Sequence, residues 1–85
     1  MKEFNYKIKD PVGIHARPAG ELVKKAMEFK SSITIKKGEK AADAKKIFSV
    51  MTLGAVQNDE LVILVEGEDE ADAFNSIKNF FEEKL

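Results

Sequence analysis

The chain lacks several features that would assign it to a class of protein at once. It has no cysteine, which excludes a disulfide framework and a thiolate metal site. No apolar run approaches the ~20 residues that a membrane-spanning helix needs. The first residues alternate and carry charge, unlike a secretory signal peptide. We therefore expect a cytoplasmic protein.

A marked excess of charge of one sign is also missing. Fourteen Lys and Arg residues stand against 15 Asp and Glu, for a net charge of −1. Nucleic acid is therefore not expected as the main partner, because binding to its phosphates needs a clear basic excess. A length of 85 residues with 44% hydrophobic content predicts one ordinary domain spanning 1–85. The lysines of the middle region, Lys36, Lys37 and Lys40, are expected to be solvated on a hairpin.

Hydrophobic periodicity predicts an alternating order of strands and helices. The predicted elements are a strand at 2–8, a helix from about Ala16 to Phe29, a strand at 33–36, a short helix at 46–53, a central strand at 61–65, and a last helix with Asp69 as its candidate N-cap. The segment Lys40–Asp43 is only a weak candidate for a further strand. This order predicts a two-layer α+β fold.

The short helix carries more apolar side chains than one helix can bury against a single core. Val50 and Leu53 suit the inward side. The others, Ile47, Phe48 and Met51, would then form an exposed apolar patch, which usually marks a binding surface.

The chemistry gathers at the stretch Gly13–Gly20, with the sequence GIHARPAG, which holds the only histidine and the only arginine. Pro18 suits a first helical turn, which places His15 at or near the N-cap. A helix start stabilises anions, phosphate especially, and favours a neutral imidazole with a lone pair free for attack. Arg17 can offer a forked donor to phosphoryl oxygens. A lone histidine is more often an ordinary surface residue, but the cluster supports a phosphoryl-carrying site.

The same stretch resembles the active-site signature of HPr, the histidine-containing phosphocarrier family of the bacterial phosphoenolpyruvate:sugar phosphotransferase system. Two further blocks resemble that family, Lys45–Gly54 (KKIFSVMTLG) and Gly67–Glu70 (GEDE). The resemblance covers essentially the whole chain. It implies an open-faced β-sandwich of βαββαβα order, with a four-stranded antiparallel sheet and three helices on one face.

The resemblance also implies a function. His15 would accept a phosphoryl group from phosphorylated Enzyme I and pass it to sugar-specific Enzyme IIA proteins, so the protein would be a carrier and not an enzyme. Arg17 and the backbone around Ala16, Arg17 and Pro18 would hold the phosphoryl oxygens, with no metal or cofactor. A monomer is expected, since one face must meet successive partners. The expected partner-binding residues are Ile14, Gly20, Lys24, Ile47, Phe48, Met51 and Thr52.

Three positions depart from the family pattern, Gly20 and Asn58 mildly and Lys46 in a way that matters for function. In HPr proteins under regulatory control, a dedicated kinase phosphorylates a serine at the position matched here by Lys46. Lysine cannot be phosphorylated in that way, so we predict that this control is absent. The departure leaves other functions open: a specialised HPr-like protein in a regulatory phosphorelay, a protein-binding regulator that carries no phosphate, or a ligand-binding module with a coincidental motif.

Overall fold

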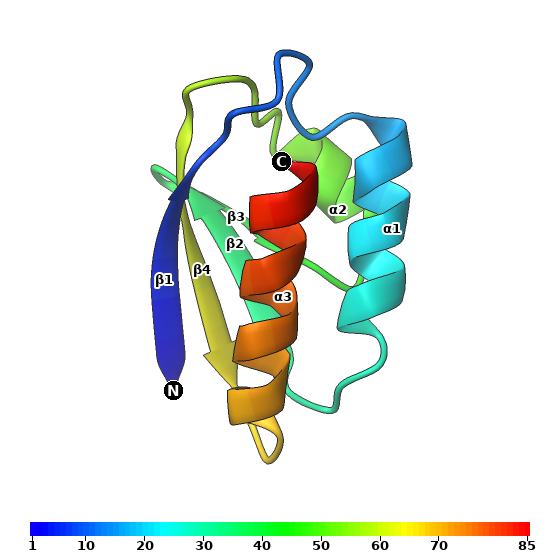
Figure 1. Ribbon diagram of the computed structural model, residues 1–85, viewed down its shortest axis with the longest axis vertical. Coiled ribbons are helices and arrows are strands. Elements are labelled where there is room, and N and C mark those ends of the chain that lie inside the picture. The colour runs from blue at the N-terminus through cyan, green and yellow to red at the C-terminus, as the bar shows by residue number, and fades with distance from the viewer.

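The computed structural model describes residues 1–85 as one sheet with helices packed against it (Figure 1). The elements in chain order are β1 (Lys2–Lys7), α1 (Ala16–Ala26), β2 (Ser32–Lys37), β3 (Lys40–Asp43), α2 (Ile47–Thr52), β4 (Glu60–Glu66) and α3 (Glu70–Lys84). This is the predicted α+β order of βαββαβα, and it includes the weakly predicted strand β3.

The sheet is antiparallel throughout, with the strand order β1-β4-β2-β3. β4 lies in the interior of the sheet, as its continuous apolar sequence predicts. Its register pairs Phe4 of β1 and Ile35 of β2 with Ile63. Because all three side chains are buried, the register sets one continuous apolar row on the inner face.

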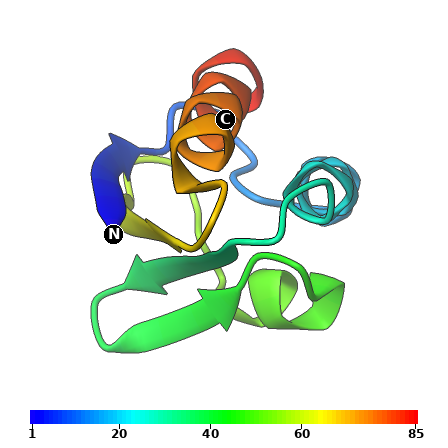
Figure 2. The same ribbon diagram turned by 90° about the horizontal axis from the view of Figure 1, so that it is seen from below.

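The core lies between that inner face and the helices. Figure 2 shows α1 and α3 on the same side of the sheet, with α2 beside β3 and α1. From α3, the fully buried Ile77 and Phe81 pack inward, and the Phe81 ring makes edge-on contacts with Phe4 and Tyr6 at centroid distances of 5.8 and 5.4 Å. The aromatic stripe of the last helix is therefore core packing, as predicted.

The first helix ends at Ala26, three residues before the predicted end at Phe29. The hydrogen bonds tighten there, since Glu28 and Phe29 donate to the carbonyls three residues earlier, at 3.2 Å each. The half-buried Phe29 continues the apolar period beyond the helix, which explains why periodicity placed the end too late. Lys45 holds this turn by donating from Nζ to the Phe29 carbonyl oxygen at 2.8 Å.

The starts of α1 and α3 lie at opposite ends of the molecule (Figure 1). Asp69 is the N-cap residue of α3, as predicted, but its carboxylate caps no N–H of that helix. It accepts hydrogen bonds from the backbone N–H groups of Lys30 and Ser31, at 2.8 and 2.9 Å, and from the Ser31 hydroxyl. These bonds, that of the Ser31 hydroxyl most of all, lower the pKa of Asp69 to about 2.

Candidate phosphoryl-carrying site

His15 is the N-cap residue of α1, with the extended backbone angles φ −93° and ψ −176°. Its carbonyl oxygen accepts the first helical hydrogen bond, from the N–H of Ala19 at 3.0 Å. The predicted placement of the histidine is therefore confirmed. The imidazole is exposed and caps no backbone N–H group, so solvent reaches it at the helix start.

The first turn of α1 offers donors and no competing carboxylate. The N–H groups of Ala16 and Arg17 have no hydrogen-bond partner in the chain, and the turn contains no acidic residue. The exposed Arg17 takes part in none of the ion pairs. Pro18 was expected to help hold the phosphoryl oxygens through its backbone, but it cannot donate to them because proline has no N–H group. Two amides and one guanidinium remain to meet an anion at His15.

A close backbone contact holds the loop that precedes His15. Gly13 has a φ of +79°, and a Cβ atom there would lie 2.4 Å from the Ala55 carbonyl oxygen. The next residue, Ile14, donates its N–H to that same oxygen at 3.0 Å. Only glycine tolerates both this φ and this contact. The loop before His15 therefore packs against the segment that follows α2. No local sequence pattern predicts this contact.

Ile14 departs from the partner-binding prediction. Its side chain is only 7% exposed and belongs to the hydrophobic core. The reason is its position directly behind the helix start, where the core needs an apolar side chain beneath His15. Ile14 therefore supports the site from below and does not line the surface.

The apolar patch of α2 is present on the surface. Phe48 is 82% exposed, Met51 41% and Ile47 37%, whereas Val50 and Leu53 are buried. This division is the one predicted from the crowded helix. Gly20 links the patch to α1, because a Cβ atom added there would lie 3.8 Å from Cδ1 of Ile47. The apolar patch and the start of α1 therefore share one side of the molecule.

Three other predicted positions are polar and exposed. Thr52 donates from Oγ1 to the Phe48 carbonyl oxygen at 2.6 Å, within α2. Lys46 is the N-cap residue of α2, and its side chain is exposed. Lys24 lies on α1, nearly two turns beyond the first turn that holds Arg17.

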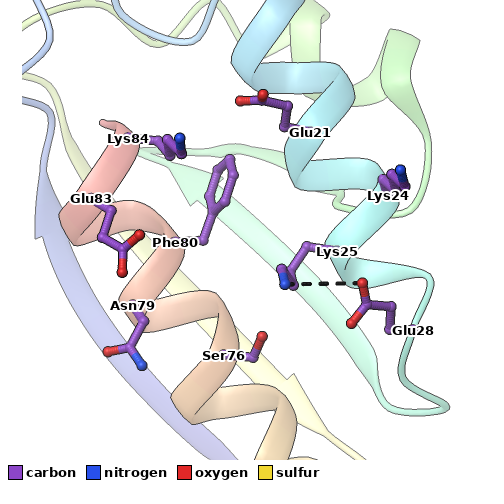
Figure 3. A pocket seen from close by; sticks show the side chains of 9 residues that line it. All are labelled: Glu21, Lys24, Lys25, Glu28, Ser76, Asn79, Phe80, Glu83 and Lys84. Carbon is purple, nitrogen blue, oxygen red and sulfur yellow. Dashed lines mark ion pairs between the residues drawn. The ribbon is translucent and has the colours of Figure 1, made fainter.

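Lys24 also lines a groove between α1 and α3, and neither His15 nor Arg17 is among the residues that line it. Figure 3 shows side chains of both helices around it, with the Lys25–Glu28 ion pair of α1 at 4.0 Å. The groove has a volume of about 530 Å³ and is lined by Glu21, Lys24, Lys25, Glu28, Ser76, Asn79, Phe80, Glu83 and Lys84. Three acidic and three basic side chains balance one another, so the groove concentrates no charge of one sign.

Lys37 was expected to be solvated on a hairpin, and this prediction is wrong. Its ammonium group donates to the Gly54 carbonyl oxygen at 2.9 Å and lies 3.0 Å from Oδ2 of Asp59. No local pattern predicts this pair, since the two residues are far apart in the chain. No group of three or more His, Asp or Glu side chains is arranged to hold a metal ion. None of the helices is both long and apolar enough to cross a membrane.

Comparison with known proteins agrees with this geometry. The sequence matches the family described as "PTS HPr component phosphorylation site" over residues 2–83. It is 45% identical over 83 residues to the phosphocarrier protein HPr of Lysinibacillus sphaericus, covering 98% of this chain and 94% of that protein. It is 42% identical over 83 residues to HPr of Mycoplasma pneumoniae, covering 96% and 94%.

Solved structures of HPr proteins are similar to this chain in fold as well as in sequence. The HPr-C-His structure from Thermoanaerobacter tengcongensis superposes with a TM-score of 0.93 at 38% identity, over 99% of this chain and 94% of that chain. An HPr dimer from the same organism superposes with a TM-score of 0.78 at 38% identity, over 99% and 97%. The fold and the matched residues agree: this chain belongs to the HPr family of phosphocarrier proteins of the phosphotransferase system.

Proposed function

We propose that His15 accepts a phosphoryl group from phosphorylated Enzyme I and passes it to sugar-specific Enzyme IIA proteins. The observation that carries the proposal is the open start of α1, with an exposed imidazole at the N-cap and two unpartnered N–H groups behind it. A neutral ring nitrogen of His15 attacks phosphorus as the bond from phosphorus to the donor breaks. In a second exchange, a nucleophile of the acceptor attacks phosphorus as the bond to the His15 nitrogen breaks and the imidazole leaves.

The other groups of the site stabilise charge and position the group. The N–H groups of Ala16 and Arg17 meet the phosphoryl oxygens, and the Arg17 guanidinium adds a positive charge that no carboxylate of the chain neutralises. Since the site is exposed, the partner that docks on it must exclude water. The protein is consumed and regenerated as a substrate of its partners, in the cytoplasm.

The docking surface in this proposal is the apolar patch of Ile47, Phe48 and Met51, with the neighbouring positions Gly20, Lys24 and Thr52. Exposed Phe and Met side chains suit a face that meets several partners in turn, because methionine adapts its shape to each. Such sequential docking is compatible with a monomer, which gel filtration at working concentration can test. Ile14 is left out of this surface because it is buried.

The test is phosphorylation by purified Enzyme I and phosphoenolpyruvate, followed by intact mass. We expect one acid-labile phosphoryl group on the wild-type chain and none on His15→Ala. The His15→Ala variant should keep its fold, since the imidazole caps no backbone N–H group. Transfer to His15→Ala, or none to the wild type from any Enzyme I, would contradict the proposal.

Lys46 makes a second part of the proposal testable. Its exposed lysine offers no hydroxyl, so the chain escapes the serine kinase that controls many members of the family. Incubation with such a kinase and ATP should add no phosphate to the wild type, whereas Lys46→Ser should be modified. Modification of the wild type, for example on the neighbouring Ser49, would overturn this part.

The exposed patch also fits a regulator that docks without carrying phosphate. The His15→Ala variant separates the two functions. A carrier loses its activity in the cell although docking survives, whereas a pure regulator retains its effect.

A further inference from the structure

The segment between α2 and β4 forms the support on which the loop before His15 rests. Ala55 lies in this segment and accepts the N–H of Ile14 at 3.0 Å. A Cβ atom at Gly13 would lie 2.6 Å from Cα of Val56, so the two backbones are in direct contact. Any shift of residues 54–56 must therefore move Gly13 and Ile14, the two residues directly before His15.

Two charged side chains fix that support on both sides of Ala55. On one side, Lys37 donates from Nζ to the Gly54 carbonyl oxygen at 2.9 Å. On the other, Oδ2 of Asp59 accepts the N–H of Val56 at 2.9 Å. The two side chains are joined to each other by the 3.0 Å ion pair. Ala55 is therefore held between two residues that are each bound by one member of the Lys37–Asp59 pair.

The pair is better placed than an ordinary surface ion pair. The side chains of Lys37 and Asp59 are 31% and 25% exposed, so water and salt screen them less than a fully exposed pair. The hydrogen bond from the Val56 N–H, followed by that from Lys37, lowers the pKa of Asp59 below its ordinary value. The carboxylate is consequently charged at neutral pH, and the pair is intact there.

A second set of bonds ties the same segment to the end of β1. The N–H of Ile8 donates to the Asp59 carbonyl oxygen at 3.0 Å, and the N–H of Asn58 donates to the Ile8 carbonyl oxygen at 2.8 Å. The loop that carries His15 begins just after Ile8. Asp59 is therefore linked to that loop at its beginning through the backbone and, through Val56 and Ala55, at its end.

We propose that Lys37 and Asp59 are positioning residues for His15, acting through the backbone of Gly54, Ala55 and Val56 to hold the start of α1 in the geometry that phosphoryl transfer needs. Neither side chain touches the reacting group. This inference rests on the proposed function of His15. Loss of the pair should weaken the hydrogen bond of the Ile14 amide and slow phosphoryl transfer. Both effects should be larger than the loss of global stability explains.

The experiment compares three variants of the full-length chain with the wild type. Lys37→Met keeps the aliphatic stem and removes the donor, Asp59→Asn removes the charge, and Lys37→Arg restores a positive donor. Asp69→Asn serves as the matched control, because it removes a carboxylate with several hydrogen bonds at the start of α3, the helix start that lies at the opposite end of the molecule from that of α1 (Figure 1). Three quantities are measured: amide hydrogen exchange at Ile14, the transfer rate from phosphorylated Enzyme I, and the urea midpoint.

We expect exchange of the Ile14 amide to rise about tenfold in Lys37→Met and Asp59→Asn, the size of change given by the loss of one charge-assisted hydrogen bond. Transfer should slow by roughly threefold to tenfold because near-attack geometry is sensitive to small displacements. Lys37→Arg should recover most of both. Asp69→Asn should lower the urea midpoint and leave the Ile14 amide and the transfer rate near wild type.

Two results would overturn the inference. One is Ile14 exchange that follows the urea midpoint equally in all variants, including Asp69→Asn, which would make the pair a purely structural feature. The other is faster Ile14 exchange with an unchanged transfer rate. If the wild type accepts no phosphoryl group, the proposed function fails and the positioning role fails with it, while the exchange data still decide whether the pair holds the loop.

Discussion

The two long helices begin in opposite ways. α3 begins with acidic residues, Glu70 and Asp72, in its first turn, and Glu70 accepts the Gly67 N–H through its own side chain at 3.2 Å. α1 has no acidic residue in its first turn, and the N–H groups of Ala16 and Arg17 remain unpartnered. Both helix starts carry the same partial positive charge. Acidic side chains of the chain neutralise this charge at the start of α3. The charge at the start of α1 has no such partner, so an anion from outside the chain can bind there.

This difference between the two helix starts assigns stability to the α3 end and the proposed function to the α1 end. The α3 end joins loop 30–31 to the helix through Asp69, so its charges serve folding. The α1 end keeps an exposed histidine and an unpaired arginine, which contribute little to folding and are the groups that we propose for phosphoryl transfer. Each end also has one glycine pressed against the backbone of another segment, Gly13 on Ala55 and Gly67 on Ser31.

The two glycines provide the largest effects and the first test of the comparison. Gly13→Ala and Gly67→Ala should each destabilise the fold by about 2 kcal/mol or more, because both have a positive φ and a Cβ atom would meet backbone within 2.6 Å. Only Gly13→Ala should also slow phosphoryl transfer. Urea unfolding and transfer kinetics on both variants measure this, and equal slowing in both would remove the distinction between the ends.

Arg17 gives the next largest effect, confined to function. Arg17→Ala should slow phosphoryl transfer by about 100-fold, as expected for loss of one preorganised donor to a developing charge. Its unfolding free energy should change by less than ~0.5 kcal/mol, since the side chain is exposed and unpaired. Lys36→Ala, which removes another exposed cation from β2, outside the proposed docking surface, is the control. A stability loss as large as the loss of rate would contradict the assignment.

Asp69 should dominate the acid side of the stability curve. Its pKa is about 2 in the folded chain against an ordinary 3.8, so the carboxylate stabilises the fold above pH ~4 and this contribution is lost as the pH falls toward 2. Asp69→Asn should flatten that decline without changing transfer at neutral pH. Urea midpoints between pH 2 and 7 test this, and an unchanged acid decline in the variant would disprove it.

The smallest effect comes from making the start of α1 resemble that of α3. Ala16→Glu adds an acidic residue to the open first turn and should stabilise the helix by about 0.3–1 kcal/mol through the helix dipole. The same carboxylate should repel the incoming phosphoryl group and lower the transfer rate. Ala16→Gln has the same shape without the charge and is the control. Faster transfer in Ala16→Glu would show that charge at this helix start is not decisive.

Local patterns in the sequence predicted the parts of the site that depend on neighbouring residues. Pro18 and the apolar period that follows it place His15 at the N-cap, and the crowded short helix predicts which side chains remain exposed. The resemblance to HPr added β3, whose own sequence is too weak to identify it. These features are set within a few residues along the chain.

The contacts between distant segments were not predictable in this way. Gly13 meets Ala55, Lys37 pairs with Asp59, and Asp69 binds residues 30 and 31. No periodicity signals such pairs, because they form only when the sheet and helices bring the segments together. The same reason explains why Ile14 was expected on the surface although the fold buries it.

The central claim is that the start of α1, and not that of α3, receives the phosphoryl group. The most direct measurement is the change in backbone amide chemical shifts on phosphorylation of ¹⁵N-labelled protein by Enzyme I. The account predicts large downfield shifts at Ala16 and Arg17 as their N–H groups bond to the phosphoryl oxygens, with Glu70 and Ala71 unchanged. Phosphorylated protein in which Ala16 and Arg17 do not shift would contradict it.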